Sequence, residues 1–127
     1  MKQLNLILVV AFFTLFCISC RTTKSKLNDP LQAGWKGKKV CQVIEDNSKH
    51  RILKCTFVPG VGHELHRHKP HFGYTLAGSR FRMKDASGIK EINVPTGYYF
   101  SKDSVTVHQA LNIGDSTAIF LIIEPKN

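Results

Sequence analysis

The chain has 127 residues, of which 43% are hydrophobic and 21% are charged. This length suits a single domain and leaves no room for a two-domain dinucleotide-binding enzyme. The composition excludes a disordered chain and a collagen-like chain. The formal net charge of +9 admits nucleic acid, an anionic membrane or acidic substrates as partners. The location of the basic residues decides among these partner classes.

The N-terminal segment has the pattern of an export signal. Lys2 is followed by an apolar run that ends at Ile18 and is too short to span a bilayer comfortably. A serine then precedes Cys20, and the small-residue cleavage site of an ordinary signal peptide is missing. This pattern resembles the lipobox of bacterial lipoproteins, in which the cysteine is lipidated and becomes the new N-terminus. We therefore expect a signal peptide over residues 1–19 and acylation of Cys20; an uncleaved N-terminal anchor is the alternative.

Most of the excess positive charge precedes residue 40. Residues 1–19 contain one lysine and no acid, so the processed chain carries +8. Residues 20–39 contain six basic residues against Asp29, a charge of +5, and residues 40–127 keep +3. We expect residues 20–39 to be a lipidated N-terminus and basic linker along an anionic membrane, at about 1 kcal/mol per cation. A solvated spacer is the alternative.

The expected location is the bacterial cell envelope, with the protein lipid-anchored on the periplasmic side or the outer surface. Nucleic acid is not expected as a partner in that compartment, and residues 40–127 contain no basic stretch interleaved with aromatic residues.

Two cysteines, Cys41 and Cys55, remain for an oxidising compartment. They lie in two strand-like runs, 40–45 and 51–58, on either side of the polar loop 46–50. A symmetric hairpin pairs residue 41 with residue 55 on the apolar face. A disulfide between the two cysteines is one expectation, and two buried reduced thiols are the other.

From residue 40 onward, short strand-like runs alternate with turn residues, and no helical periodicity is present. The expected strands are 40–45, 51–58, 63–68, 71–77, 79–84, 89–94, 98–101, 104–110 and 116–124. So many short strands within one small domain predict an all-β sandwich or barrel. We take residues 40–127 as the folded domain.

The placement of histidines is the most informative feature of the domain. Three of them form His66-x-His68-x-x-His71, and His108 lies further along the chain. Residues two apart on a strand point to the same side, and a Lys-Pro break lets the third histidine return to the same point. Converging neutral imidazoles bind a divalent transition metal such as Zn, Fe, Mn, Ni or Cu, and His108 can complete a four-coordinate site.

The spacing of these histidines resembles the first motif of the cupin superfamily. That motif reads Gly, five residues, His-x-His, three or four residues, Glu, six residues, Gly. This chain matches it from Gly60 through His66-Arg67-His68 to Gly78. His71 stands in the Glu position, and the gap before it is one residue short.

The second cupin motif reads Gly, five residues, Pro-x-Gly, two residues, His, three residues, Asn. The chain keeps this spacing from Gly97 through His108 to Asn112, with Asp103 and Val105 in place of the inner Pro and Gly. The resemblance covers roughly residues 40 to 124.

The resemblance implies a jelly-roll β-barrel with a metal near one mouth, held by residues His66, His68, His71 and His108. Four imidazoles bring no negative charge, so a bound dication would keep its charge and attract anionic ligands. A small cupin of this kind also makes a homodimer an expected assembly.

We therefore expect a metal-binding cupin of the bacterial cell envelope that binds or acts on a small anionic or oxygen-rich molecule. The cupin family does not determine the reaction, because it includes dioxygenases, isomerases, decarboxylases and hydrolases. No catalytic residue and no organic cofactor are assigned. Thr75, Tyr98 and Phe100 are candidates for the cavity wall, and Glu64 and Asp103 are the nearest candidate bases.

Two other interpretations stay open. One is a non-catalytic ligand-binding lipoprotein with a structural metal, because four protein ligands fill a tetrahedral site. The other is a metal-free barrel whose histidines line a polar cavity. The expected partners are a small-molecule ligand and the membrane through the lipid anchor. His50 and His63 are expected on the surface.

Overall fold

The computed structural model describes residues 26–126, so the expected signal peptide and Cys20 lie outside the described residues. Within that range the chain is built from strands, which confirms the all-β expectation. The strands are β1 (Gly34–Trp35), β2 (Lys38–Lys39), β3 (Cys41–Asp46), β4 (His50–Phe57), β5 (Gly62–His68), β6 (His71–Ala77), β7 (Ser79–Asp85), β8 (Gly88–Val94), β9 (Tyr99–Lys102), β10 (Thr106–Asn112) and β11 (Ala118–Pro125). Among the described residues, no helix has the length and apolar character to cross a membrane.

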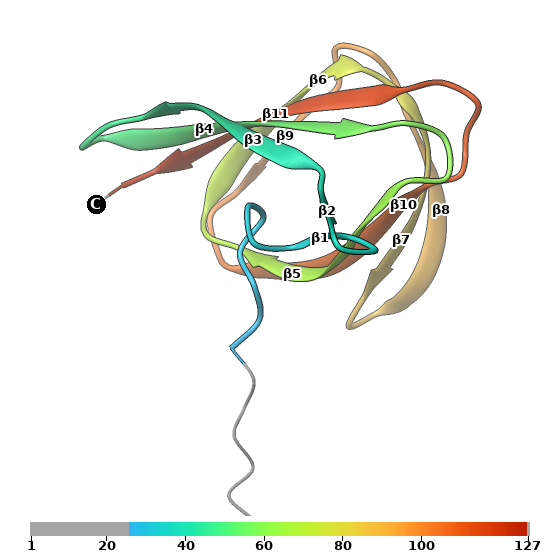
Figure 1. Cartoon of the computed structure of the whole chain (residues 1–127), viewed down its shortest axis with the longest axis horizontal. Helices are drawn as coiled ribbons and strands as arrows, with labels where there is room; N and C mark the ends of the chain where they lie inside the picture. Colours follow the sequence, from blue (N-terminus) through green and yellow to red (C-terminus); the bar gives the residue numbers. More distant parts are fainter. Residues whose placement is uncertain (1–25, 127) are drawn as a thin grey trace, which may run out of the picture.

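Two antiparallel sheets face each other and curve into a jelly-roll barrel (Figure 1). One sheet has four strands in the order β5-β10-β7-β8, and the other has five in the order β3-β4-β11-β6-β9. β5 and β6 are consecutive in the chain but belong to different sheets. The break at Lys69 and Pro70 between them therefore carries the chain from one wall of the barrel to the other.

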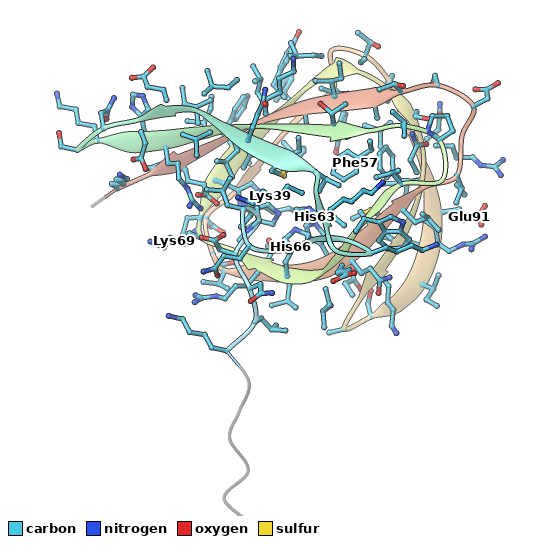
Figure 2. All side chains as sticks on the ribbon, in the orientation of Figure 1. Lys39, Phe57, His63, His66, Lys69 and Glu91 are labelled. Atoms are coloured by element: carbon cyan, nitrogen blue, oxygen red, sulfur yellow. A yellow bond between two sulfur atoms is a disulfide. The ribbon has the colours of Figure 1, made fainter. Side chains whose placement is uncertain are left out.

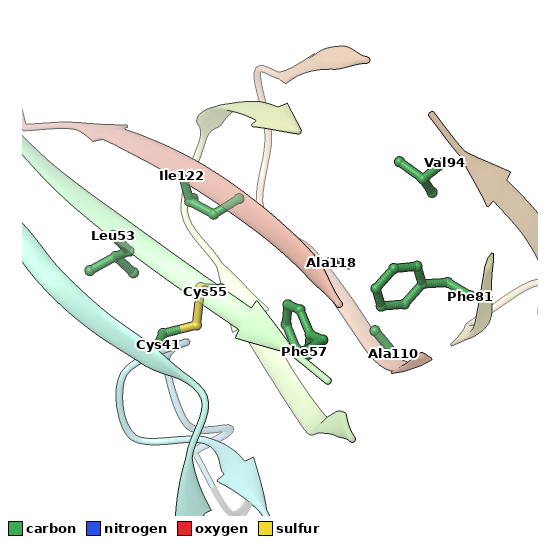
Figure 3. Packing of buried hydrophobic residues seen from close by; sticks show 9 residues of the cluster. All are labelled: Cys41, Leu53, Cys55, Phe57, Phe81, Val94, Ala110, Ala118 and Ile122. Carbon is green, nitrogen blue, oxygen red and sulfur yellow. A yellow bond between two sulfur atoms is a disulfide. The ribbon is translucent and has the colours of Figure 1, made fainter. Parts of the chain in front are cut away.

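Strand alternation brings apolar side chains from both sheets into one core. The core consists of Cys41, Leu53, Cys55, Phe57, Phe81, Val94, Ala110, Ala118 and Ile122 (Figure 3). Phe57 on β4 and Phe81 on β7 meet edge to face at 5.7 Å between ring centroids, which joins the two sheets. Each such buried side chain contributes about 1.5–3 kcal/mol to folding.

The hairpin of β3 and β4 carries a disulfide between Cys41 and Cys55, whose Cα atoms are 4.0 Å apart. The two cysteines lie directly opposite each other, and Val43 pairs with Leu53 as the symmetric hairpin predicts. A bulge then shifts the register, so that Glu45 pairs with residue 52 instead of residue 51. The bulge lies between the cysteines and the loop and leaves the cysteine pairing unchanged.

The packed part of the chain begins before residue 40. Pro30 and Ala33, which the sequence analysis places in the linker, are buried, and the backbone of residue 28 accepts a hydrogen bond from the N–H of Arg67 on β5. β1 and β2 form a tight hairpin whose turn residues Lys36 and Gly37 both have positive φ angles, of 50° and 78°. The linker therefore contributes its C-terminal half to the barrel.

Gly62 lets β1 lie close against β5. A Cβ atom on Gly62 would lie 2.8 Å from the ring of Trp35. The indole of Trp35 therefore occupies the space that a side chain at position 62 would need.

Candidate metal centre

Three histidines meet on the inner face of the four-stranded sheet. His66 and His68 are two residues apart on β5, so both side chains point into the barrel. His108 lies directly opposite His66 on the neighbouring strand β10. One ring nitrogen from each of the three lies within 4.8 Å of the other two, and the Nε2 atoms of His66 and His68 are 2.8 Å apart. This is the spacing of ligands around one metal at bond lengths of about 2.0–2.1 Å.

His71 approaches the same point from the other sheet. It is the first residue of β6, it is buried, and its ring stacks on the ring of His68 at 4.5 Å between centroids. Its side chain faces the cavity. Its ring nitrogens are not part of the compact group formed by His66, His68 and His108. The structure therefore brings together three of the expected ligands and places the fourth beside them.

Backbone carbonyls orient two of the imidazoles. The Nδ1 atom of His66 lies 2.7 Å from the carbonyl oxygen of Glu64, and that of His71 lies 2.7 Å from the carbonyl oxygen of Lys69. Because a carbonyl oxygen only accepts, each Nδ1 carries the hydrogen. In the neutral ring the lone pair is then on Nε2, which is the form that binds a metal.

Burial favours the uncharged form of three of these imidazoles. Burial, together with the neighbouring histidines, lowers the pKa of His66 to about 2 and that of His108 to about 3. Burial also lowers the pKa of His71. His66, His71 and His108 therefore present neutral nitrogen atoms at physiological pH, so a metal would displace few protons from them on binding.

The expectation that His63 lies on the surface is wrong. Its side chain points into the barrel next to His66, with ring centroids 3.8 Å apart, and is only 3% exposed (Figure 2). The reason is a bulge: His66 pairs with His108 and His63 pairs with Ala110, so three steps along β5 match two along β10. The Nε2 atom of His63 donates to the carbonyl oxygen of Pro30, 3.0 Å away, which ties the N-terminal segment to the site.

His50 lies away from the site, on the hairpin of β3 and β4. Its Nε2 atom is 3.1 Å from a carboxylate oxygen of Glu45, and a third of its side chain is exposed. It is available as a reference histidine in experiments on the metal site.

A cavity of about 730 Å³ opens beside the histidines. Its inner wall is mostly apolar and includes Phe57, Phe81, Met83, Phe100 and Phe120. The exposed residues Lys90, Lys102 and Val105 also line it, which places them toward the solvent side. A small ligand can therefore reach the histidines along an apolar wall.

The other side chains singled out from the sequence have different positions. Tyr98 and Phe100 line the cavity, as expected for wall residues. Thr75 is completely buried, and its hydroxyl has no hydrogen-bond partner among the described residues. Glu64 points away from the cavity and accepts a hydrogen bond from the N–H of Lys36, and Asp103 is exposed.

Sequence reasoning missed a buried carboxylate behind His68. Glu124 on β11 is 3% exposed, and one of its oxygens lies 3.8 Å from the Nδ1 atom of His68. The signal was present in the strand: residue 124 has the same inward phase as Ile122 and Ala118, which are both buried. An acidic residue at a core position of a strand is seldom accommodated without a partner.

Comparison with protein-family models and with curated proteins finds no match to this chain. Solved structures do resemble it. A cupin domain from Bordetella pertussis Tohama I matches with a TM-score of 0.65 and 20% identity, over 69% of this chain and 93% of that one. The polyketide cyclase RemF from Streptomyces resistomycificus matches with a TM-score of 0.56 and 16% identity, over 68% of this chain and 64% of that one. A predicted oxalate decarboxylase from Thermotoga maritima matches with a TM-score of 0.52 and 18% identity, over 68% and 79%.

These matches cover about two thirds of the chain at 16–20% identity, which shows the fold and not the reaction. Together with the two-sheet jelly roll and its inward-facing histidines, they show that this chain has the cupin fold.

Proposed function

We propose that the protein binds a divalent transition metal through His66, His68 and His108, with His71 as a fourth ligand, and uses it to hold or transform a small anionic molecule. The observation that carries this proposal is the convergence of three imidazoles, those of His66 and His68 buried and that of His108 half-buried, on the wall of an open cavity. The donor set suits Zn, Fe, Mn, Ni or Cu, because all of these accept imidazole nitrogen.

Charge favours an anionic ligand. Four imidazoles leave a bound dication with its full charge, and Lys102 adds a further cation on the cavity wall. Lys90 also lines the cavity, but its ammonium group lies 3.7 Å from a carboxylate oxygen of Asp85, which offsets its charge. Lys102 makes no ion pair with another described residue within 4.0 Å. Its ammonium group is therefore free to attract an incoming anion.

The apolar wall of the cavity indicates that the rest of the ligand, away from its anionic group, is apolar. The aromatic rings of Phe57, Phe81 and Phe120 pack against one another at 5.6–6.0 Å between centroids and face the cavity. A ligand with an apolar body and one anionic group would place the body on these rings and the anion at the metal. A small apolar carboxylate has this character.

A bound metal would act as a Lewis acid that polarises an oxygen of the ligand. The chain's own groups would orient the ligand: the aromatic wall covers its apolar body, and Tyr98 lines the same cavity. Glu64 and Asp103 do not line the cavity. Among the similar folds, one belongs to a polyketide cyclase and another to a predicted oxalate decarboxylase, so this fold supports more than one type of reaction.

The proposal places the protein in the bacterial cell envelope, anchored by a lipid on Cys20. The lipobox-like end of the apolar run supports the anchor, and the disulfide between Cys41 and Cys55 fits an oxidising compartment. Intact mass of the membrane-extracted protein tests it. We expect a chain that begins at Cys20 and carries acyl groups, and a Cys20→Ala variant that is not processed. An unlipidated mature chain that begins at Arg21 or later would contradict the anchor.

The metal proposal is tested by loading the protein with Co²⁺ and titrating it with benzoate and with benzamide while recording the visible spectrum. We expect benzoate to shift the Co²⁺ bands and to bind at least tenfold more tightly than the amide, because only benzoate is charged. The His66→Gln variant should lose the Co²⁺ spectrum, and His50→Gln should keep it. Failure of the wild-type protein to bind Co²⁺ overturns the proposal. A tetrahedral spectrum that neither ligand changes favours a structural metal in a non-catalytic lipoprotein.

A further inference from the structure

A chain of charges stands behind His68, on the side of the imidazole that faces the five-stranded sheet; it is buried at Glu124 and becomes more exposed toward Arg51 and Asp29. Glu124 on β11 pairs with Arg51 on the neighbouring strand β4. The Nε atom of Arg51 donates to the Oε2 atom of Glu124 at 2.7 Å, and its Nη1 atom lies 3.2 Å from Asp29. Both Arg51 contacts to Glu124 use Oε2, which leaves Oε1 turned toward His68. The orientation of this carboxylate is therefore fixed by the guanidinium group.

Two polar atoms face each other here without a hydrogen bond. The Nδ1 atom of His68 and the Oε1 atom of Glu124 are both buried, and neither has a hydrogen-bond partner among the described residues. They lie 3.8 Å apart, which is too long for a hydrogen bond. Leaving buried polar groups unpaired is unfavourable, so a pair of them beside a candidate metal site needs a physical reason.

The hydrogen positions on the histidines supply the reason. Nδ1 of His66 donates to the carbonyl of Glu64, so in the neutral ring its Nε2 atom can only accept. The 2.8 Å contact between the two Nε2 atoms then requires His68 to donate from its Nε2 atom. A neutral His68 in that form has a bare Nδ1 atom. Two acceptors therefore face each other across 3.8 Å, and no bond between them can form.

Metal binding reverses this arrangement. A metal bound through the Nε2 atom of His68 requires the lone pair at that atom, so the single proton of the neutral ring must be on Nδ1. The ring gives up one proton from Nε2 and takes up one at Nδ1 through solvent, with no change in its charge. The Nδ1–H group would then face the free oxygen of Glu124, which can accept it.

We propose that Glu124 is a positioning residue for the metal ligand His68: it accepts the Nδ1–H of the metal-binding tautomer and is itself held in place by Arg51. This inference rests on the proposed metal site. The carboxylate fixes the direction of the imidazole and makes it a stronger donor to the metal, an effect that typically changes metal affinity 10–100-fold.

The first experiment follows the tautomer directly. Long-range ¹H–¹⁵N spectra of the imidazoles are recorded on the full chain with and without Zn²⁺. We expect His68 to change from the Nε2–H to the Nδ1–H form on Zn²⁺ binding, while His66 and His71 keep Nδ1–H throughout because their carbonyl partners do not change. A His68 ring with Nδ1–H before Zn²⁺ is added, or with a bare Nδ1 atom after it, overturns the proposal.

The second experiment measures Zn²⁺ affinity by competition with a chelator. Glu124→Leu should bind Zn²⁺ 10–100-fold more weakly than the wild-type protein. Glu124→Gln keeps an oxygen that can accept and should lose less. Glu91→Gln is the matched control, because Glu91 pairs with Arg82 on the exposed side of the four-stranded sheet. If Glu124→Leu folds poorly, the Zn²⁺ affinity of Glu124→Gln and the imidazole spectra of the wild-type protein still show whether Glu124 positions His68.

The metal site and the positioning role of Glu124 are contradicted by different results. A wild-type chain that does not bind Zn²⁺ contradicts the metal site itself and with it the role of Glu124. A wild-type chain that binds Zn²⁺ tightly, with Glu124→Leu and Glu124→Gln equally tight, leaves the metal site intact and removes the positioning role alone.

Discussion

The two sheets of the barrel contribute to the candidate site in different ways. The four-stranded sheet supplies His66, His68 and His108 from β5 and β10, which are hydrogen-bonded neighbours, so the backbone register alone sets their spacing. The five-stranded sheet supplies His71 and Glu124 from across the barrel, so their distance from the other three histidines depends on how the two walls pack. The register of two paired strands places the first three histidines, and the packing of one sheet on the other places His71 and Glu124.

This difference predicts unequal effects of removing one ligand from each wall. His108→Gln should weaken Zn²⁺ binding at least a thousandfold, about 4 kcal/mol, because it removes one of three nitrogens that already converge. His71→Gln should weaken it about tenfold, because its ring lies beside the compact group. Isothermal titration of both variants measures the ratio. Equal losses of Zn²⁺ affinity in the two variants would show that His71 contributes as much to metal binding as His108.

Much of the fold could be predicted from the sequence because strand alternation and turn residues are local signals. The expected strands 71–77 and 79–84, for example, match β6 and β7 to within one residue. The hairpin of β1 and β2 was missed, because two-residue strands leave no alternation to detect. The dipeptide Lys36-Gly37 was the only turn signal of this hairpin. It is a weak signal, because a lysine at a positive φ angle is uncommon.

Less of the site could be predicted, because two of its features depend on contacts between distant residues. The inward turn of His63 follows from a bulge against β10, and a bulge changes which face each residue takes without changing the composition of the strand. The role of Glu124 depends on Arg51, which is 73 residues away in the chain. The His-x-His spacing, by contrast, needs only the two-residue period of one strand.

Removing the disulfide changes the stability of the five-stranded sheet without touching the metal ligands on the four-stranded sheet. Replacing Cys41 and Cys55 together by alanine should lower the free energy of unfolding by about 3 kcal/mol, the chain-entropy value for a loop of roughly 15 residues. Zn²⁺ affinity should change less than threefold, because the three converging histidines lie on the other sheet. Urea denaturation and chelator competition measure the two quantities. A large loss of affinity would show that the two walls are coupled more tightly than the register of β5 and β10 implies.

The charge at the metal can be altered from the five-stranded sheet alone. His71→Glu places a carboxylate beside the metal, where like charges about 4 Å apart at an effective dielectric near 20 repel by about 4 kcal/mol. The preference of the Co²⁺-loaded protein for benzoate over benzamide should therefore fall at least tenfold, whereas His71→Gln should keep it. An unchanged or stronger preference for benzoate in the His71→Glu variant would show that position 71 does not set the charge of the site.

The smallest expected effect concerns His63, which the bulge turns inward on the four-stranded sheet. Burial lowers the pKa of His63 to about 4, below its ordinary value of 6.5. The unfolded chain therefore takes up a proton at this residue before the folded chain does, so its contribution to stability is complete above pH 6.5 and is lost as the pH falls toward 4. Between pH 6.5 and 5.5 this residue alone should account for about 1 kcal/mol of lost stability.

His63→Gln keeps a donor for the carbonyl of Pro30 but does not titrate, so the metal-free variant should lose about 1 kcal/mol less than the wild-type protein over the same interval. Urea denaturation at the two pH values measures this difference in slope, which does not depend on the absolute stability of the variant. Because the other buried histidines titrate in both proteins, their effect cancels in the comparison. Parallel pH profiles would mean that the side chain of His63 reaches solvent in the folded protein, and the bulge between β5 and β10 would then not fix its inward position.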